Sequence, residues 1–543
     1  MKKGKKLGIG VQTIQDFSEE NLVYVDKTEK LYELMQVPKH NFIVRPRRFG
    51  KSLMLSTLGA IYEGKKDCFE ETWIYDKIDW EKIKRPVLRL DFTQIGYDSI
   101  SLEQGLRNYL VSFAEKLKIN LPVELDSRGM FKYLIETLGK EKPIVILIDE
   151  YEMAVTDFVG IEEEQEKMEE NIRTLKKFYS VMKGAGDYIH RSYITGVTKI
   201  GQVSILSDLN MLNDLTLDRR FTTLLGYTEQ ELRKYYEEFI EAAALEYKAS
   251  IPEILARIKQ HYNGYSWDGI EENKVYNPFS IVNFFQSLKF RNYWFNTGTP
   301  TILVRGARKQ KITLDDLENI EGGGNLLSNA NLKQFYSLSL LFQSGYLTIK
   351  EEIDDDWFRL GFPNEEVRQS FASYLLAEYL DEEWSNMEYT IAFKLKTHLE
   401  RQQLKEAFQI FAPVISSTGY DITKHTEGYF HTIMHVLMYS TGLAVFSELE
   451  NAQGRLDTIC VAKKAIYIFE FKINSTAAAA LTQIKNQNYA AQFLSNVGQA
   501  GKELYIIGVN FVTADKKINE ILVEKWENGT FTKVEGDFVP KFE

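Results

Sequence analysis

The chain is short of the features that mark secreted, zinc-binding or membrane proteins. It has two cysteines, Cys68 and Cys460, in 543 residues. Two are too few for a disulfide framework or a cysteine-based zinc site, and such scarcity fits a reducing cytoplasm. No stretch approaches the roughly 18 apolar residues of a membrane-spanning helix. The basic start MKKGKKLGIGVQ is not followed by an apolar run, which argues against a signal peptide. We therefore expect a cytoplasmic protein with no membrane partner.

Positive charge is also in the minority. Lysine and arginine number 66 against 77 aspartates and glutamates, a net charge of −11. This balance gives no general attraction to nucleic acid, although a local basic cleft is enough to bind it. The apolar share of 44% and the charged share of 26% are ordinary for a globular protein. The length predicts two or three domains.

Composition divides the chain into three pieces. Residues 1–230 alternate short apolar runs such as NFIV and PIVILIDE with amphipathic helices, which predicts an α/β domain with a parallel sheet. Residues 231–385 are predicted to be a mainly helical lid or linker, entered through an N-cap at Thr228 with a capping box completed by Glu231. Residues 386–543 combine a helix, two strand-like runs around a tight turn, an alanine-rich helix and a further strand, which predicts a second α/β domain.

The stretch RPRRFGKS, residues 45–52, lies between an apolar strand and a helix. In a phosphate-binding loop, G-x-x-x-x-G-K-[ST], backbone amides surround the phosphates, the lysine reaches the outer ones and the hydroxyl holds magnesium. Arg45 replaces the first glycine, and a positive φ there would cost about 1–2 kcal/mol. A chance Gly-Lys-Ser is the alternative, which the strand–helix context disfavours. The predicted nucleotide-binding residues of this loop are Arg48, Phe49, Gly50, Lys51 and Ser52.

A second strand carries the acids that a nucleotide site needs. KPIVILIDEYEMAV ends its apolar run at Asp149 and Glu150. Asp149 can hold magnesium through water, and Glu150 can orient the attacking water as a catalytic residue. A third strand, RSYITGVTKI, carries Thr195, Thr198 and Lys199 at its end. Thr198 is the predicted γ-phosphate contact, although threonine at a strand end also reflects β-propensity. These residues predict binding of ATP with Mg²⁺.

The segment LTLDRRF adds two arginines, Arg219 and Arg220. Either could act as an arginine finger on a phosphate group. A surface salt-bridging pair explains them equally well. A finger supplied by a neighbouring chain would require a homo-oligomer, and the sequence does not choose between monomer, dimer and ring.

The segment GRLDTICVAKKAIYIFEFK predicts a hairpin that turns at Lys463 and Lys464. With that turn, Asp457 faces Glu470, and strand alternation puts Lys472 on the same face. Two adjacent carboxylates repel each other unless a cation lies between them, so this pair predicts a site for Mg²⁺ or Mn²⁺ with a catalytic lysine. The alternative is an exposed charged face with an ion pair worth under ~1 kcal/mol. A slip of one residue in the register would separate the facing groups.

Three residues on the helix before this hairpin have the chemistry of metal ligands. His431 and His435 follow Glu427 by one and two turns, on the same stripe. Because the sequence marks no further ligand for a histidine site, we expect His435 in the core and His431 near the cleft.

The chain resembles a known bacterial family. The segments VYVDKT, RPRRFGKS, LIDEYE, TGVTKI and LLGYTEQEL are similar to the AAA-ATPase-like family, and HYNGYSWDG, VYNPFSIVNFF and LFQSGYLTI continue the resemblance through the middle piece. In that family the loop often has this form, which implies that Arg45 belongs to an ATP-binding loop. Members commonly carry a C-terminal PD-(D/E)XK nuclease-like domain, of the restriction-endonuclease-like α/β fold. Asp457, Glu470 and Lys472 match its D…ExK pattern, and Glu427 stands where such nucleases often place a further metal-side acid.

The resemblance also implies a substrate and a role. Gln483 and Tyr489 have the Q-x5-Y spacing of residues that touch the nucleic-acid backbone. The implied function is ATP-regulated, metal-dependent cleavage of nucleic acid, DNA favoured over RNA, which would suit defence against foreign DNA. One alternative is a nucleotide-switched module that binds nucleic acid or a protein without cutting it. A motor or remodeller acting in a ring is a third hypothesis.

Overall fold

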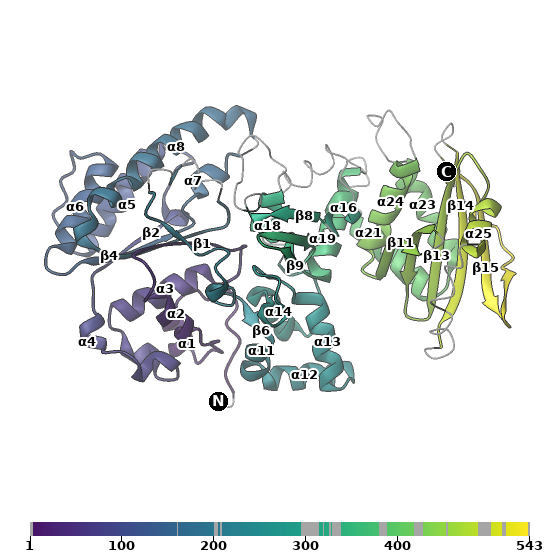
Figure 1. Cartoon of the computed structure of the whole chain (residues 1–543), viewed down its shortest axis with the longest axis horizontal. Coiled ribbons are helices and arrows are strands. Elements are labelled where there is room, and N and C mark those ends of the chain that lie inside the picture. The colour runs from purple at the N-terminus through teal and green to yellow at the C-terminus, as the bar shows by residue number, and fades with distance from the viewer. Residues whose placement is uncertain are drawn as a thin grey trace. The chain divides into compact units, whose positions relative to one another are not determined.

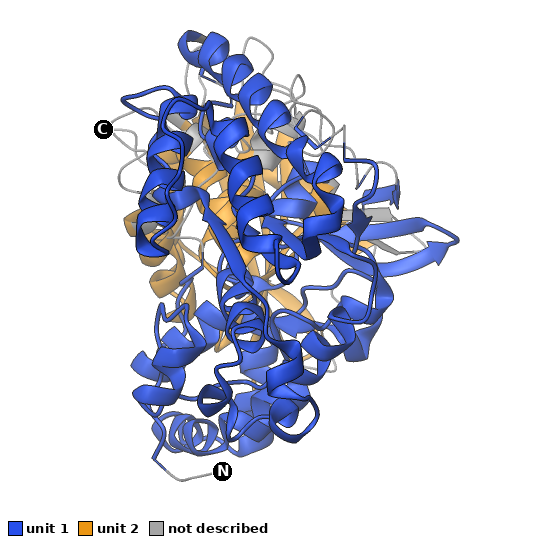
Figure 2. Ribbon diagram, turned by 90° about the vertical axis from the view of Figure 1, so that its left-hand side faces the viewer, with its two compact units in different colours: residues 1–302, 320–366 blue, residues 303–319, 367–543 orange. Residues whose placement is uncertain are grey.

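A computed structural model of the chain separates into two compact units (Figures 1 and 2). The first comprises Met1–Ile302 and Ile320–Glu366, and the second Leu303–Asn319 and Val367–Glu543. The division into residues 1–230, 231–385 and 386–543 stays a prediction, since the first unit takes in the first piece and most of the second. The structure describes residues 4–159, 161–199, 205–206, 209–294, 314–318, 320–324, 327, 338–379, 388–416, 427–451, 454–486, 493, 501–512 and 517–540.

The first unit is built on a five-stranded sheet in the order β2-β3-β4-β1-β5, and each neighbouring pair is parallel. Its central strands are buried almost throughout, as strands covered on both faces must be. The predicted parallel sheet is therefore confirmed. The strands are β1 (His40–Val44), β2 (Val87–Asp91), β3 (Ile144–Asp149), β4 (Ile189–Gly196) and β5 (Asn213–Asp214).

Helices cover both faces of this sheet (Figure 1). One face carries α5 (Leu102–Lys116), α6 (Ser127–Gly139), α7 (Met153–Thr156), α8 (Gln165–Tyr179) and α9 (Val181–Gly184). The other carries α1 (Ile14–Glu19), α2 (Thr28–Leu34), α3 (Lys51–Tyr62) and α4 (Trp80–Ile83). Side-chain caps at Ser101 and Asp126 start α5 and α6. The apolar stripes of α5, α6 and α8 pack on the strands through Leu106, Leu134 and Leu175.

The rest of the first unit combines helices with two small sheets. Thr228 and Glu231 do form the predicted capping box at the start of α11. The helices are α11 (Glu229–Tyr235), α12 (Glu237–Tyr247), α13 (Ile251–Tyr262), α14 (Pro278–Ser287) and α18 (Leu338–Ser344). The strands are β6 (Tyr227–Thr228) with β7 (Val275–Tyr276), and a sheet in the order β8-β10-β9 of β8 (Ile320–Gly323), β9 (Thr348–Asp354) and β10 (Trp357–Gly361). Most of β9 is exposed, so it lacks the apolar pattern that predicts a strand.

The second unit has its own six-stranded sheet, in the order β11-β12-β13-β14-β15-β16. All neighbours are antiparallel except β13 and β14, which are parallel and joined through α25. That helix packs closely, since a Cβ added at Gly508 would lie 2.2 Å from the carbonyl oxygen of Ala477. The strands are β11 (Ala444–Asn451), β12 (Gly454–Val461), β13 (Ala465–Ile473), β14 (Glu503–Val512), β15 (Lys517–Glu527) and β16 (Thr530–Lys533). The helices are α16 (Leu314–Glu318), α19 (Glu365–Tyr379, which begins in the first unit), α21 (Glu388–Glu400), α22 (Leu404–Gln409), α23 (Phe411–Ser416), α24 (Glu427–Ser440) and α25 (Ala477–Asn486).

Both cysteines are free thiols, Cys68 half-buried and Cys460 buried. Burial raises the pKa of the Cys460 thiol to about 12, so it stays protonated at neutral pH. Across the described ranges, no helix has both the length and the apolar character needed to cross a membrane.

Candidate functional site

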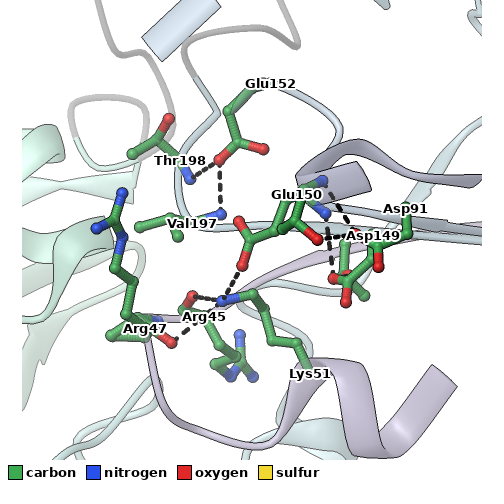
Figure 3. Close-up of polar contacts among 12 residues, drawn as sticks. Arg45, Arg47, Lys51, Asp91, Asp149, Glu150, Glu152, Val197 and Thr198 are labelled. Atoms are coloured by element: carbon green, nitrogen blue, oxygen red, sulfur yellow. Dashed lines mark hydrogen bonds and ion pairs between the residues drawn. The ribbon is translucent and has the colours of Figure 1, made fainter. Parts of the chain in front are cut away.

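The loop between β1 and α3 carries the predicted phosphate-binding residues (Figure 3). Gly50 is the N-cap of α3 with φ +94°, and Arg48 has φ +69°. The left-handed residues of the loop are therefore Arg48 and Gly50. Arg45 does not have a positive φ, so it does not carry the backbone strain that a replaced glycine would have. The chain then enters the amino end of α3, where backbone amides without a partner inside the helix favour the binding of an anion.

Arg45 anchors the start of the loop. Its side chain is fully buried, at 0% exposure. The guanidinium donates hydrogen bonds to the carbonyl oxygens of Val44 and Thr216, both at 2.9 Å, and of Phe221 at 3.2 Å. Its Cζ also lies 4.0 Å from the centre of the Trp267 ring. The arginine that replaces the pattern's glycine therefore joins the loop to the segment after β5 and to the aromatic core of the unit.

Arg45→Met is expected to lower the free energy of unfolding by about 3 kcal/mol, because buried carbonyl oxygens lose their donor. Burial lowers the pKa of Arg45 to about 9 and the charges of Asp214 and Asp268 raise it, so the donor is charged at neutral pH. Urea unfolding measures the change. The control, Arg220→Met, alters an exposed arginine and should cost less than ~0.5 kcal/mol. Equal losses in the two variants would contradict the anchoring role.

The side chains at the centre of the loop pack against aromatic residues. Phe49 is 1% exposed and makes edge contacts with Tyr265 and Trp267, at ring-centroid distances of 4.8 and 5.7 Å. Arg48 is exposed, with Cζ 5.1 Å from the centre of the Phe279 ring. A contact of Phe49 with a nucleotide can therefore involve only its backbone.

Lys51 links the loop to the end of β3. It is 4% exposed, and its Nζ donates to the carbonyl oxygens of Arg45 at 3.2 Å and Pro46 at 3.4 Å. The same Nζ lies 3.4 Å from Oε1 of Glu150 (Figure 3). The helix start thus provides a buried cation where a nucleotide's phosphates would need one.

The end of β3 brings a carboxylate to the same place. Asp149 Oδ1 accepts hydrogen bonds from Thr195 Oγ1 at 2.7 Å and from the amide of Glu150 at 3.1 Å. Burial and the Glu150 charge raise the pKa of Asp149, whereas hydrogen bonds from Ser52 and Thr195 and the charge of Lys51 lower it. A serine hydroxyl on α3 beside a carboxylate at a strand end is a donor set that fits Mg²⁺ next to nucleotide phosphates.

Two further features of this edge come only from the structure. Glu150 has φ +51°, a left-handed conformation that costs a non-glycine residue about 1–2 kcal/mol and is found preferentially at functional sites. Asp91, at the end of β2, stands in register with Asp149 and adds a third carboxylate (Figure 3). The sequence analysis missed Asp91, although an acid at the end of an apolar run was a usable indication.

Glu152 is the clearest residue that the sequence analysis missed. It is 2% exposed, and its Oε1 accepts hydrogen bonds from the amides of Val197 at 2.6 Å and Thr198 at 2.8 Å. It therefore holds the segment after β4 that contains the predicted phosphate contact (Figure 3). Lys199, next along, is buried and pairs with Asp214 at 2.6 Å. No sequence pattern marks a contact between segments 45 residues apart.

Burial and the Glu150 charge raise the pKa of Glu152 from its ordinary value near 4.5 to about 8. Between these values the unfolded chain gives up a proton that the folded chain keeps, so this group lowers the free energy of unfolding as pH rises. Glu152→Gln keeps the accepting oxygen and cannot ionise. We expect the variant to gain stability relative to the native chain between about pH 5 and pH 8.5, measured by urea unfolding. The buried Glu366, whose pKa is also raised to about 8, is present in both proteins and cancels in the difference. A difference in the free energy of unfolding between the two proteins that stays constant across this pH range would contradict the raised pKa of Glu152.

The two candidate arginine fingers lie on a short turn, Arg219–Phe221, and both side chains are exposed. Arg219 pairs with Glu352, and Arg220 pairs with Asp218 at 2.6 Å. This geometry matches the surface-pair alternative, and a role for either residue as a finger stays a prediction.

The predicted hairpin of the second unit is present. β12 and β13 pair antiparallel with Thr458 opposite Phe469, which is the predicted register around the turn 463–464. One position further along, the same register places Asp457 opposite Glu470. A slip by one residue is thereby excluded for the described pairs.

The face of β13 that carries Glu470 also carries Lys472. Glu470 is 1% exposed, and its Oε1 accepts a hydrogen bond of 3.0 Å from the Lys472 ammonium. Phe469 and Phe471 lie on the other face, both buried, with ring centroids 6.1 Å apart. The exposed-face alternative is therefore wrong for Glu470, which is a buried carboxylate held by a lysine.

The side chains of Glu427 and His431 in α24, of Asp457 in β12, and of Tyr489 lie outside the described residues. Gln483 is half-buried on α25, and His435 is buried as expected. No group of three or more histidine, cysteine, aspartate or glutamate residues suited to a metal occurs within the described ranges, which exclude two of the three predicted ligands. A buried glutamate beside a lysine is nevertheless donor chemistry that fits a divalent cation.

Two protein-family models match the chain, each over a range that includes one of the candidate sites. Residues 8–206 match the family model of a predicted AAA-ATPase, and residues 425–521 match that of the PD-(D/E)XK nuclease superfamily. An uncharacterized protein in the vnfD 5′ region of Azotobacter chroococcum mcd 1 is 32% identical over 534 residues, 96% of this chain and 99% of the relative. The chain belongs to the AAA-ATPase-like family with a PD-(D/E)XK domain. In this AAA-ATPase-like protein, the first match contains the loop between β1 and α3 and the ends of β2, β3 and β4, and the second contains the β12–β13 hairpin.

Proposed function

We propose that this AAA-ATPase-like protein is a nucleotide-regulated, metal-dependent nuclease that cleaves DNA. The observation that carries the proposal is the buried Glu470, bonded to Lys472 on a strand whose register puts Asp457 opposite it. Its two domain families support ATPase and nuclease potential. That the cleaved polymer is DNA and that a nucleotide regulates the cleavage are both parts of the proposal.

In the first unit, ATP would bind with its phosphates at the amino end of α3. The amides that follow Arg48 and the Lys51 ammonium provide the positive groups. Ser52 and Asp149 would hold Mg²⁺, which when bound neutralises phosphate charge. Glu150 would orient the attacking water, and Thr198 would contact the terminal phosphate.

In the second unit, Asp457, Glu470 and Glu427 would hold Mg²⁺ or Mn²⁺, which when bound activates water and stabilises the charge that develops on the phosphodiester. Lys472 holds the Glu470 carboxylate in place and supplies a positive charge beside it. Gln483 and Tyr489 would contact the substrate backbone. The hairpin register supports the part of this arrangement that needs Asp457, Glu470 and Lys472 on one face.

The presence of both units in one chain supports regulation by nucleotide. An unregulated nuclease would cut its host's own DNA, so a nuclease joined to an ATPase suits an enzyme directed at foreign DNA. A cytoplasmic location belongs to the same proposal. A homo-oligomer is proposed only if Arg219 or Arg220 completes a neighbour's nucleotide site, and sedimentation with and without ATP tests that point.

The test is cleavage of linear DNA, supercoiled DNA and single-stranded RNA by the full chain, with Mg²⁺ or Mn²⁺ and with and without ATP. We expect DNA to be cut only with a metal ion, at a rate that changes when ATP is added. If only RNA is cut, the proposed substrate is RNA and not DNA. If none of these polymers is cut under any of these conditions, the proposed nuclease activity is wrong.

A further inference from the structure

The amino edge of the ATPase sheet carries a row of basic residues, at the opposite end of the strands from the phosphate loop. Arg85 lies two residues before β2, Lys142 two residues before β3 and Lys39 directly before β1, while His190 and Arg191 are in the first residues of β4. The strands are parallel and lie in the order β2-β3-β4-β1, so each brings its basic group to the same edge. We name Lys39, Arg85, Lys142 and Arg191, together with His190, the basic edge.

The basic edge borders an open depression of about 460 Å³. Lys39, His190 and Arg191 line it, and Asp187 is the one carboxylate in its lining. All four cations are half-buried, so they are partly removed from water. A partly desolvated cation binds an anion more strongly than a fully hydrated one.

The four cations have no carboxylate partner within ion-pair distance in the described part of the chain. Each of them donates hydrogen bonds to backbone carbonyls. Lys39 donates to Gly186 at 2.5 Å, Lys142 to Lys82 at 3.3 Å, and Arg85 to Lys82 at 3.0 Å and Lys84 at 2.8 Å. Arg191 donates to Val37 and, at 3.3 Å, to Pro38, and it also bonds the Tyr62 side chain. Carbonyl dipoles orient these groups without cancelling their charge. Two nearby carboxylates offset part of this charge, since Asp187 acts on Lys39 and Glu81 on Lys142. The cations still outnumber these two carboxylates, which is unexpected in a chain of net charge −11.

The charges of the basic edge act together on one group. Burial lowers the pKa of His190 to about 4, and the charges of Arg85, Arg191, Lys39 and Lys142 contribute to the lowering. All four cations are therefore close enough to one imidazole to influence its ionisation. They form one positive field across the edge of the sheet.

We propose that the basic edge binds the phosphodiester backbone of a nucleic-acid strand. Neighbouring strands of a sheet lie about 4.8 Å apart, so four strands spread the cations over roughly 14 Å, enough for several phosphates of one extended strand. The depression is open, as a site for a polymer must be, whereas small-ligand pockets are largely enclosed. The site is distinct from the nucleotide site and from the hairpin of the second unit, and its binding does not need cleavage. The choice of nucleic acid over other polyanions rests on the proposed function.

The test uses the full chain carrying Lys472→Ala, so that the polymer is not cut, and fluorescence anisotropy of a labelled single-stranded DNA of ~30 nucleotides at about 50 to 200 mM salt. Lys39→Gln with Lys142→Gln should weaken binding about tenfold and lower the slope of log Kd against log salt by about 1.4, for two lost phosphate contacts. The matched control is Lys30→Gln with Lys132→Gln, which removes the same charge from lysines already paired with Glu33 and Glu136. The control should stay within about twofold.

Equal affinity and slope in the two double variants would overturn the inference. Weakened binding to anionic lipid vesicles with unchanged binding to DNA would also overturn it, by assigning the edge to a membrane surface. Full displacement of DNA by equimolar inorganic pyrophosphate would assign the edge to a small phosphate ligand instead.

A second measurement avoids substitutions in case the double variant fails to fold. Saturating DNA should protect Lys39 and Lys142 of the otherwise unchanged chain from acetylation, read by mass spectrometry, and leave Lys30 and Lys132 reactive. If the native chain cleaves DNA but DNA does not protect these two lysines, the inference is wrong and the proposed function stands. If DNA protects them but the chain cleaves no polymer, the inference stands and the proposed nuclease activity is wrong.

Discussion

We expect Lys472→Ala to lower the rate of the proposed DNA cleavage by about a thousandfold or more and to leave the proposed ATP binding unchanged. The Lys472 ammonium donates to Glu470 at 3.0 Å, and it is the positive group that the described residues place beside this buried carboxylate. Charge that develops on a phosphodiester in a partly desolvated site is stabilised far more strongly by a fixed cation than it would be in water. Cleavage of supercoiled DNA at saturating Mn²⁺ measures the effect.

The matched control for this prediction is Lys464→Ala, in the exposed turn of the same hairpin. It removes the same charge from the same element, and it should cleave within about twofold of the native chain. Glu470→Gln separates charge from size: it keeps the volume of the buried side chain but removes the anion, and it should be as inactive as Lys472→Ala. Native cleavage rates in both Lys472→Ala and Glu470→Gln would place the reaction outside this hairpin. Thermal unfolding of each variant checks that the fold is retained.

We expect Lys51→Ala to lower the affinity for ATP by about a hundredfold or more. The side chain is almost fully buried, and its ammonium lies among two loop carbonyls and Glu150 at the start of α3. Without it, the outer phosphates face Glu150 and Asp149 with no protein cation from this helix, which adds repulsion to the lost attraction. Titration calorimetry with ATP and Mg²⁺ measures the affinity.

Two further variants test whether the loss of ATP affinity is specific to Lys51. Lys65→Ala removes an exposed lysine beyond the end of α3 that pairs with Glu63, and it should bind ATP like the native chain. Lys51→Arg keeps the charge but places a wider, planar group in a nearly closed position, so we expect affinity between those of the alanine variant and the native chain. Unchanged affinity in Lys51→Ala would exclude this loop as the nucleotide site. If nucleotide controls the nuclease, Lys51→Ala should also abolish the response of DNA cleavage to ATP.

The sequence predicted well wherever the relevant residues lie close together along the chain. Gly50, Lys51 and Ser52 follow a strand and open a helix, and the structure has that arrangement. The hairpin register followed from a two-residue turn, because antiparallel pairing is set by the position of the turn. The capping box at Thr228 is equally local.

The predictions that were incomplete depended on contacts between distant segments or on exposed elements. Arg45 looked like a strained replacement for glycine, and the structure shows it to be a buried anchor for carbonyls more than 170 residues away. The acidic run EEIDDDWF suggested a solvated loop or hairpin tip, and it lies at the tip of the β9–β10 hairpin. The exposed β9 has no apolar alternation, so the strand itself and the three-stranded sheet were not predicted.

The sequence by itself determined three local features: a Gly-Lys-Ser loop between a strand and a helix, a strand that ends in acids, and a hairpin with Glu470 and Lys472 on one face. These follow from local residue order and from the periods of helix and strand. Only the tertiary structure decided that Glu152 holds the segment of Thr198, that Asp91 stands beside Asp149, and that basic residues from four strands share one edge. The physical reason is that the order of parallel strands is set by how the helices and strands pack. Neighbours in that order, such as β1 and β4, are separated by more than a hundred residues of sequence.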